Sequence, residues 1–128
     1  YTIRNIFMGF FICRTHVNIF IGECKNYTKP VGVTYVGKFY SLLRTTNINC
    51  GIFFSIKGLG GKTNWDSSKG LVRKMALRDN TYILDVEYLD FLAIYQKKEN
   101  IFSVLERKYS SLKCDISYDS FVKKHDLE

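Results

Sequence analysis

An acid and a base stand two residues apart at the end of a short apolar run. The run covers residues 19–22, and Glu23, Cys24 and Lys25 follow it. Side chains two residues apart on a β-strand point to the same face, so Glu23 and Lys25 are expected to share one. Charges on a buried face are costly unless they pair or hold an ion, which makes this strand end a candidate site. Most such pairs are solvated ion pairs, so the tripeptide alone is open to either interpretation.

Two longer patterns follow this pair. Glu-Cys-Lys-Asn-Tyr (residues 23–27) leads through Lys-Pro-Val (residues 29–31) into a helical pattern, and Gly-Ile-Phe-Phe-Ser-Ile-Lys-Gly occupies residues 51–58. The series resembles the restriction-endonuclease-like, PD-(D/E)xK nuclease superfamily, in particular its Mrr-like members, over about residues 17–94. The resemblance implies an α/β fold with a mixed central sheet flanked by helices. It also implies a restriction-type or defence endonuclease that hydrolyses phosphodiester bonds of double-stranded DNA.

The resemblance assigns roles to three neighbouring residues. Glu23 would be a ligand of Mg²⁺ or Mn²⁺, and the backbone carbonyl of Cys24 would be a further metal ligand. Lys25 would be the catalytic lysine, which orients the attacking water or offsets charge in the transition state.

The chain departs from the superfamily at the expected upstream aspartate, because residues 1–22 contain neither Asp nor Glu. Asn18 stands where some relatives have that catalytic and metal-binding residue, and Asn5 is the alternative. Along a straight strand, positions 18 and 23 would lie roughly 17 Å apart, so a bend or bulge before Phe20 is required. A natural inactive variant, an engineered Asp-to-Asn change and an aspartate lost with a missing N-terminus all fit. We expect a weak nuclease or none.

The formal net charge of +7 favours a polyanionic partner, of which nucleic acid is the commonest. The residues expected to contact phosphate lie on two helices and on a basic glycine-rich loop: Lys38, Lys57, Lys62, Arg73 and Lys74. That loop is not a P-loop, since Ile56 occupies a required glycine position. The rival interpretations are a non-catalytic nucleic-acid-binding or assembly module that keeps the fold, and a basic protein with neither role.

The length of the chain, its cysteines and its apolar runs limit the architectures that it can form. The 128 residues are enough for one domain, with a helical extension from about residue 99, and the first residue, tyrosine, suggests a fragment of a longer chain. The four cysteines form no Cys-x-x-Cys pair, and Cys24 and Cys50 are expected to be small buried hydrophobes. We therefore expect a reduced, cytoplasmic protein, which the resemblance allows to be a homodimer. No apolar run is long enough to span a bilayer, so no membrane role is expected.

The periodicity of apolar residues predicts strands that alternate with helices. A strand over residues 1–12, with Gly9 as a bend or bulge, and a turn at 14–16 precede the strand at 17–24. The helix at 31–45 is expected to face inward through Val33, Val36, Tyr40 and Leu43. The remaining expectations are strands at 50–56 and 81–86, helices at 65–77, 87–94 and 99–113, and a polar tail. Asp66, Ser67 or Ser68 is expected to cap the helix at 65–77.

Overall fold

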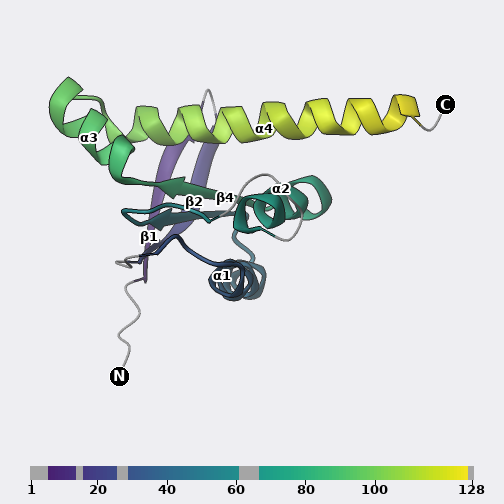
Figure 1. Cartoon of the computed structure of the whole chain (residues 1–128), viewed down its shortest axis with the longest axis horizontal. Coiled ribbons are helices and arrows are strands. Elements are labelled where there is room, and N and C mark those ends of the chain that lie inside the picture. Colours follow the sequence, from purple (N-terminus) through teal and green to yellow (C-terminus); the bar gives the residue numbers. More distant parts are fainter. Residues whose placement is uncertain (1–5, 14–15, 26–28, 61–66, 127–128) are drawn as a thin grey trace.

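The computed structural model describes residues 6–13, 16–25, 29–60 and 67–126. Strands and helices alternate along most of the chain, which confirms the predicted α/β class (Figure 1). The elements are β1 (Ile6–Cys13), β2 (His16–Cys24), α1 (Val33–Thr46), β3 (Cys50–Phe54), α2 (Ser68–Asp79), β4 (Tyr82–Val86), α3 (Tyr88–Lys97) and α4 (Ile101–Asp126).

The four strands form one mixed sheet in the order β1-β2-β3-β4. β1 and β2 pair antiparallel, whereas β2, β3 and β4 run parallel to one another. α1 joins β2 to β3 and α2 joins β3 to β4. Both helices pack in one buried cluster on the same face of the sheet, as two right-handed crossovers in the same direction require. The helix α4 crosses the other face (Figure 1). The three parallel strands therefore end together, at what we call the carboxyl edge: residues 23–25, 53–55 and 85–87.

Apolar side chains fill both faces of the sheet. On the face of α1, the rings of Phe39 and Phe53 are fully buried and their centroids lie 4.4 Å apart. Gly51 allows this approach, because a Cβ there would stand 2.5 Å from the Phe39 ring. On the face of α4, Leu105 packs in a second buried cluster that includes Leu84. The sheet is thus a middle layer between helices.

The inward stripe of α1 differs from the predicted one. Val36 and Leu43 are buried as expected, but Val33 is 42% exposed and Phe39 takes the central position. Tyr40 is half-buried, and its hydroxyl donates a hydrogen bond to the Asp79 carboxylate. Phe39 is the residue that packs on the strands because it carries a large ring without a polar atom that needs a partner.

Gly9 is not a bulge. The β1–β2 register runs without interruption from the Ile6–Glu23 pair to the Cys13–His16 pair. Gly9 lies opposite Phe20, and a Cβ at Gly9 would stand 2.6 Å from the Phe20 ring. The glycine therefore makes room for an aromatic side chain of the neighbouring strand and keeps the ladder regular.

The helix boundaries refine the sequence prediction at two places. Ser67 is the cap of α2, since its side chain accepts a hydrogen bond of 3.1 Å from the Gly70 N–H. The last helix does not end near Lys113 but continues through the expected tail to Asp126. Within the parts of the chain that the structure describes, no helix combines the length and the apolar character needed to cross a membrane.

Replacing Phe39 by alanine is expected to lower the free energy of unfolding by about 3–5 kcal/mol, because it empties a fully buried ring site. Tyr95→Ala is the control: this side chain is 84% exposed, and its loss is expected to cost less than about 0.5 kcal/mol. Denaturant unfolding followed by circular dichroism measures both. Equal losses for the two variants would contradict the described core.

Candidate functional site

Glu23 and Lys25 form an ion pair at the carboxyl edge, with 3.1 Å between Lys25 Nζ and Glu23 Oε1. Glu23 is 1% exposed and the Lys25 side chain 15% exposed. β2 lies between β1 and β3, and the Lys25 N–H donates to the Phe54 carbonyl at 2.9 Å, so pairing continues past the end of β2. The structure confirms that Glu23 and Lys25 share one face at a strand end, and it shows that they form a pair there.

Backbone hydrogen bonds hold the loops around this pair together. The Val31 N–H donates to the Gly58 carbonyl at 2.8 Å, and the Gly60 N–H donates to the Val31 carbonyl at 3.0 Å. The Ser68 hydroxyl also donates to the Val31 carbonyl, at 2.7 Å, and ties the first turn of α2 to the same point. The loop after β2, the loop after β3 and the start of α2 therefore surround one edge of the sheet.

Tyr35, in the first turn of α1, brings two of the predicted site residues together. Its ring centroid lies 4.8 Å from Lys25 Nζ and 5.8 Å from Lys38 Nζ. Sequence reasoning missed a role for Tyr35. The available signal was spacing, because residues three apart on a helix are neighbours on its surface and Tyr35 is three before Lys38.

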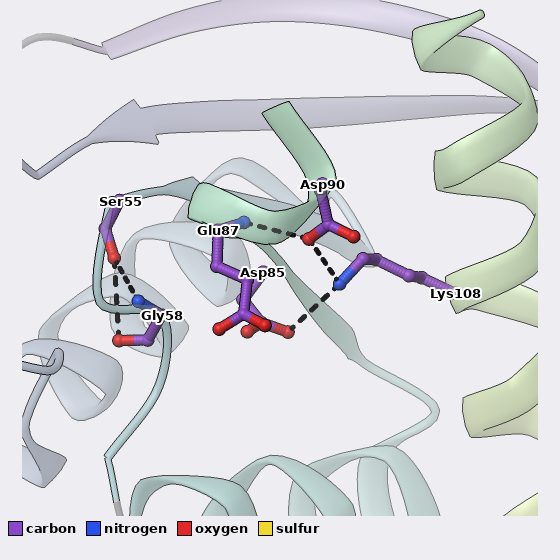
Figure 2. A network of polar contacts seen from close by, with 6 residues as sticks. All are labelled: Ser55, Gly58, Asp85, Glu87, Asp90 and Lys108. Atoms are coloured by element: carbon purple, nitrogen blue, oxygen red, sulfur yellow. Dashed lines mark hydrogen bonds and ion pairs between the residues drawn. The ribbon is translucent and has the colours of Figure 1, made fainter. Parts of the chain in front are cut away.

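A second group of charged residues follows β4 at the same edge (Figure 2). A Cβ at Gly58 would stand 2.7 Å from a Glu87 carboxylate oxygen and 3.0 Å from an Asp85 carboxylate oxygen. Gly58 also has a φ of 66°, and its N–H donates to the Ser55 hydroxyl at 2.8 Å. Glycine is therefore required at this turn both for its backbone conformation and for the close approach of the carboxylates.

Lys108 of α4 reaches this acidic group from the other face of the sheet. Its Nζ lies 2.8 Å from an Asp90 oxygen and 3.9 Å from an Asp85 oxygen. Asp90 also accepts a hydrogen bond of 2.9 Å from the Glu87 N–H, within a capping box at the start of α3. Figure 2 shows Lys108 between the two aspartates, so these charges serve at least to fix α3 and α4 at the sheet edge.

Asp85 does not stand beside Glu23 in the sheet, because Phe53 lies between them in the register. Glu23, Phe53 and Asp85 occupy one row across the sheet, so two strand spacings, roughly 10 Å, separate the acidic residues. Among the described residues, no three His, Cys, Asp or Glu side chains are grouped so that they could hold a metal ion. Glu23 with the Cys24 carbonyl supplies one negative charge, which Lys25 already offsets, so these residues by themselves do not fit the predicted Mg²⁺ site.

The structure does not bring Asn18 beside Glu23. Asn18 pairs with Phe11, whereas Glu23 pairs with Ile6, five positions farther along the same two strands. The pairing has no bulge between Ile6 and Cys13. The bend that the Asn18 prediction requires is therefore not present in the described part of β2. Ile6 is the residue that lies opposite Glu23, and the alternative candidate Asn5 precedes it in the chain but lies outside the described residues.

The predicted phosphate-binding residues divide into two groups. Lys38 and Lys57 are exposed close to the carboxyl edge: Lys38 contacts the same Tyr35 ring as Lys25, and Lys57 lies in the loop after β3. Arg73 and Lys74 are half-buried on α2. Arg73 lines a surface hollow of about 240 Å³ with Lys69 and residues of β4 and α4. Lys62 lies outside the described residues.

The two strand cysteines have different environments. Cys50 is buried as predicted, and burial raises the pKa of its thiol to about 12, so it stays protonated and is not a nucleophile at neutral pH. Cys24 is exposed, which corrects the prediction of a buried residue. It is the last residue of β2, and its side chain points away from the face that buries Glu23.

Comparison of the chain with protein-family models, curated proteins and solved structures gives no match. The resemblance carried by residues 23–27 and 51–58 therefore stays a prediction, as do a homodimer and a cytoplasmic location. What the structure adds is that residues 21–24 and 51–54 pair as adjacent parallel strands that end at one edge.

Replacing Lys25 by methionine is expected to lower the free energy of unfolding by about 3 kcal/mol, because it leaves the buried Glu23 carboxylate without its ammonium partner. Adding Glu23→Gln in the same chain removes the buried charge and is expected to restore most of the lost free energy of unfolding. Lys38→Met, at an exposed lysine, is the control. Urea unfolding of the parent, these three variants and Glu23→Gln alone tests this, and additive losses in the double variant would contradict a buried pair.

Proposed function

We propose that the chain is a DNA-binding domain of the PD-(D/E)xK endonuclease type, which holds the phosphodiester backbone at its carboxyl edge. The observation that carries the proposal is the buried Glu23–Lys25 pair at the end of an interior strand. A buried ion pair is a poor source of stability compared with apolar residues of similar size, so a role in binding better accounts for it. Open α/β sheets also bind ligands outside the carboxyl ends of their strands.

The charge distribution around the edge supports a phosphate ligand. Lys25 and Lys38 face one tyrosine ring, and Lys57 lies on the adjoining loop. The chain as a whole carries a formal charge of +7. Lysines that neutralise phosphates release counterions from DNA, which provides affinity without reading the base sequence. Duplex DNA is thus the partner whose chemistry matches this edge.

Lys25 has the clearest chemical role in this proposal. Its ammonium group is held in place by a buried carboxylate, so it is oriented before any ligand arrives. A fixed positive charge of this kind stabilises negative charge that develops on a phosphoryl oxygen. Glu23 holds Lys25 in position and also limits the net positive charge buried beneath α1.

The second candidate function is a non-catalytic nucleic-acid-binding module on the same frame. The observation that favours it is the donor set at the edge: Glu23 is engaged by Lys25, and Asp85 stands across Phe53 from it. Because the described residues place no second carboxylate beside Glu23 in the register, a divalent cation finds little negative charge among them. DNA binding would then persist without hydrolysis.

Binding to a short DNA duplex is expected to weaken with salt, with log K falling by about 0.9 per unit of log salt for each neutralised phosphate. Lys57→Ala is expected to reduce that slope by about one phosphate contact. Lys113→Ala, at an exposed lysine of α4, is the matched control and is expected to leave the slope unchanged. Fluorescence anisotropy at several salt concentrations measures these slopes. No binding at low salt would exclude the proposed function.

Cleavage of supercoiled plasmid with Mg²⁺ or Mn²⁺ is expected to be weak or absent for the parent chain, because Glu23 brings one carboxylate that Lys25 offsets. Ile6→Asp is expected to increase Mn²⁺ binding and nicking, since Ile6 lies opposite Glu23 and directly opposed residues share one face of a sheet. Asn18→Asp, which adds the same charge farther along β2, is the control. Robust cleavage by the parent chain that survives Glu23→Ala would show that the site lies elsewhere.

A further inference from the structure

The ring of Tyr35 lies against two ammonium groups at once. Lys25 Nζ is 4.8 Å and Lys38 Nζ 5.8 Å from the ring centroid, and Tyr35 is 39% exposed. The negative face of an aromatic ring attracts cations at such distances. Glu23 offsets the charge of Lys25, so Glu23, Lys25 and Lys38 together keep one net positive charge, which attracts an anion.

The Tyr35 ring and a carboxylate act differently on the charge of a neighbouring lysine. A carboxylate accepts hydrogen bonds from the ammonium group and cancels its charge, as Glu23 does in part for Lys25 at 3.1 Å. An aromatic face attracts the ammonium group without cancelling its charge. The ring is also a weak hydrogen-bond acceptor, so it engages few of the three N–H donors of a lysine. The ring therefore attracts Lys38 without cancelling the charge that Lys38 presents to an anionic ligand.

We propose that Tyr35 is a positioning residue that holds Lys25 and Lys38 as a clamp for one backbone phosphate of DNA. The inference rests on the proposed function and deepens it, because it names the group that the edge binds and the side chain that arranges the binding site. Burial decreases from Glu23 at 1% exposed, through Lys25 at 15%, to the exposed Lys38. The clamp thus opens toward solvent at Lys38, where a phosphate enters.

The helix fixes the geometry of the clamp. Tyr35 and Lys38 are three residues apart in α1, so they are neighbours on its surface. Lys25 approaches the same ring from the end of β2, whose position is set by the hydrogen bond between the Lys25 N–H and the Phe54 carbonyl. The phosphate site therefore combines a strand end with a helix face, and it contacts the DNA backbone independently of base sequence.

Comparing Tyr35→Phe with Tyr35→Leu separates the effect of the aromatic ring on DNA binding from the effect of side-chain volume. The phenylalanine variant keeps an aromatic face and is expected to bind a DNA duplex with the parent's affinity and salt slope. The leucine variant is expected to bind roughly two- to tenfold more weakly and to lose about 0.9 from the slope, one phosphate contact. Tyr95→Leu makes the same change at an 84% exposed site on α3 and is expected to have no effect.

A double-variant cycle distinguishes positioning from a purely structural role. Lys38→Gln is expected to lower the salt slope in the parent but to add little in the Tyr35→Leu chain, because Lys38 is no longer held there. Unchanged binding by Tyr35→Leu, while the parent binds DNA with the expected slope, would overturn the clamp and leave the proposed function standing. Equal weakening by Tyr35→Phe and Tyr35→Leu would also overturn it. Absence of DNA binding by the parent would overturn both proposals.

Discussion

The structure depends on the burial of one carboxylate beside one ammonium group at the end of β2. Glu23 is almost completely removed from water, which is costly for a charge unless a partner lies nearby, and Lys25 Nζ provides that partner at 3.1 Å. This pairing requires β2 to be an interior strand, with β1 and β3 on its two sides and α1 across its face. It also requires the chain to stay paired through Lys25, which the bond to Phe54 achieves.

The carboxyl edge carries two charged groups with different chemistry. Around Glu23 the side chains are mainly basic and aromatic, and they remain partly open to solvent. Around Asp85 the acidic residues are met by Lys108, which links the sheet edge to α4. Phe53 lies in the register row between Glu23 and Asp85. The first group therefore suits an anionic ligand, whereas the second holds α3 and α4 in place.

The sequence was most informative about features that depend on the spacing of side chains within a single strand or helix. Strand alternation predicted that Glu23 and Lys25 share a face, and the order of strands and helices followed from apolar spacing. Features that depend on neighbouring strands were not accessible in this way: the position of Asn18 relative to Glu23 is set by the β1–β2 register, and Gly9 reflects the Phe20 ring beside it. Tyr35 was missed because cation–π contacts to Lys25 join a helix to a strand end.

The most direct test of the account is to map DNA contacts by two-dimensional NMR of the isotopically labelled protein. Amide signals are followed while a short duplex is added at low salt. If DNA binds at the carboxyl edge, the largest shifts fall around it, at residues 23–25, 33–38 and 55–60. Shifts concentrated instead at the opposite edge, at residues 47–49 and 80–82, or no shifts at all, would contradict it.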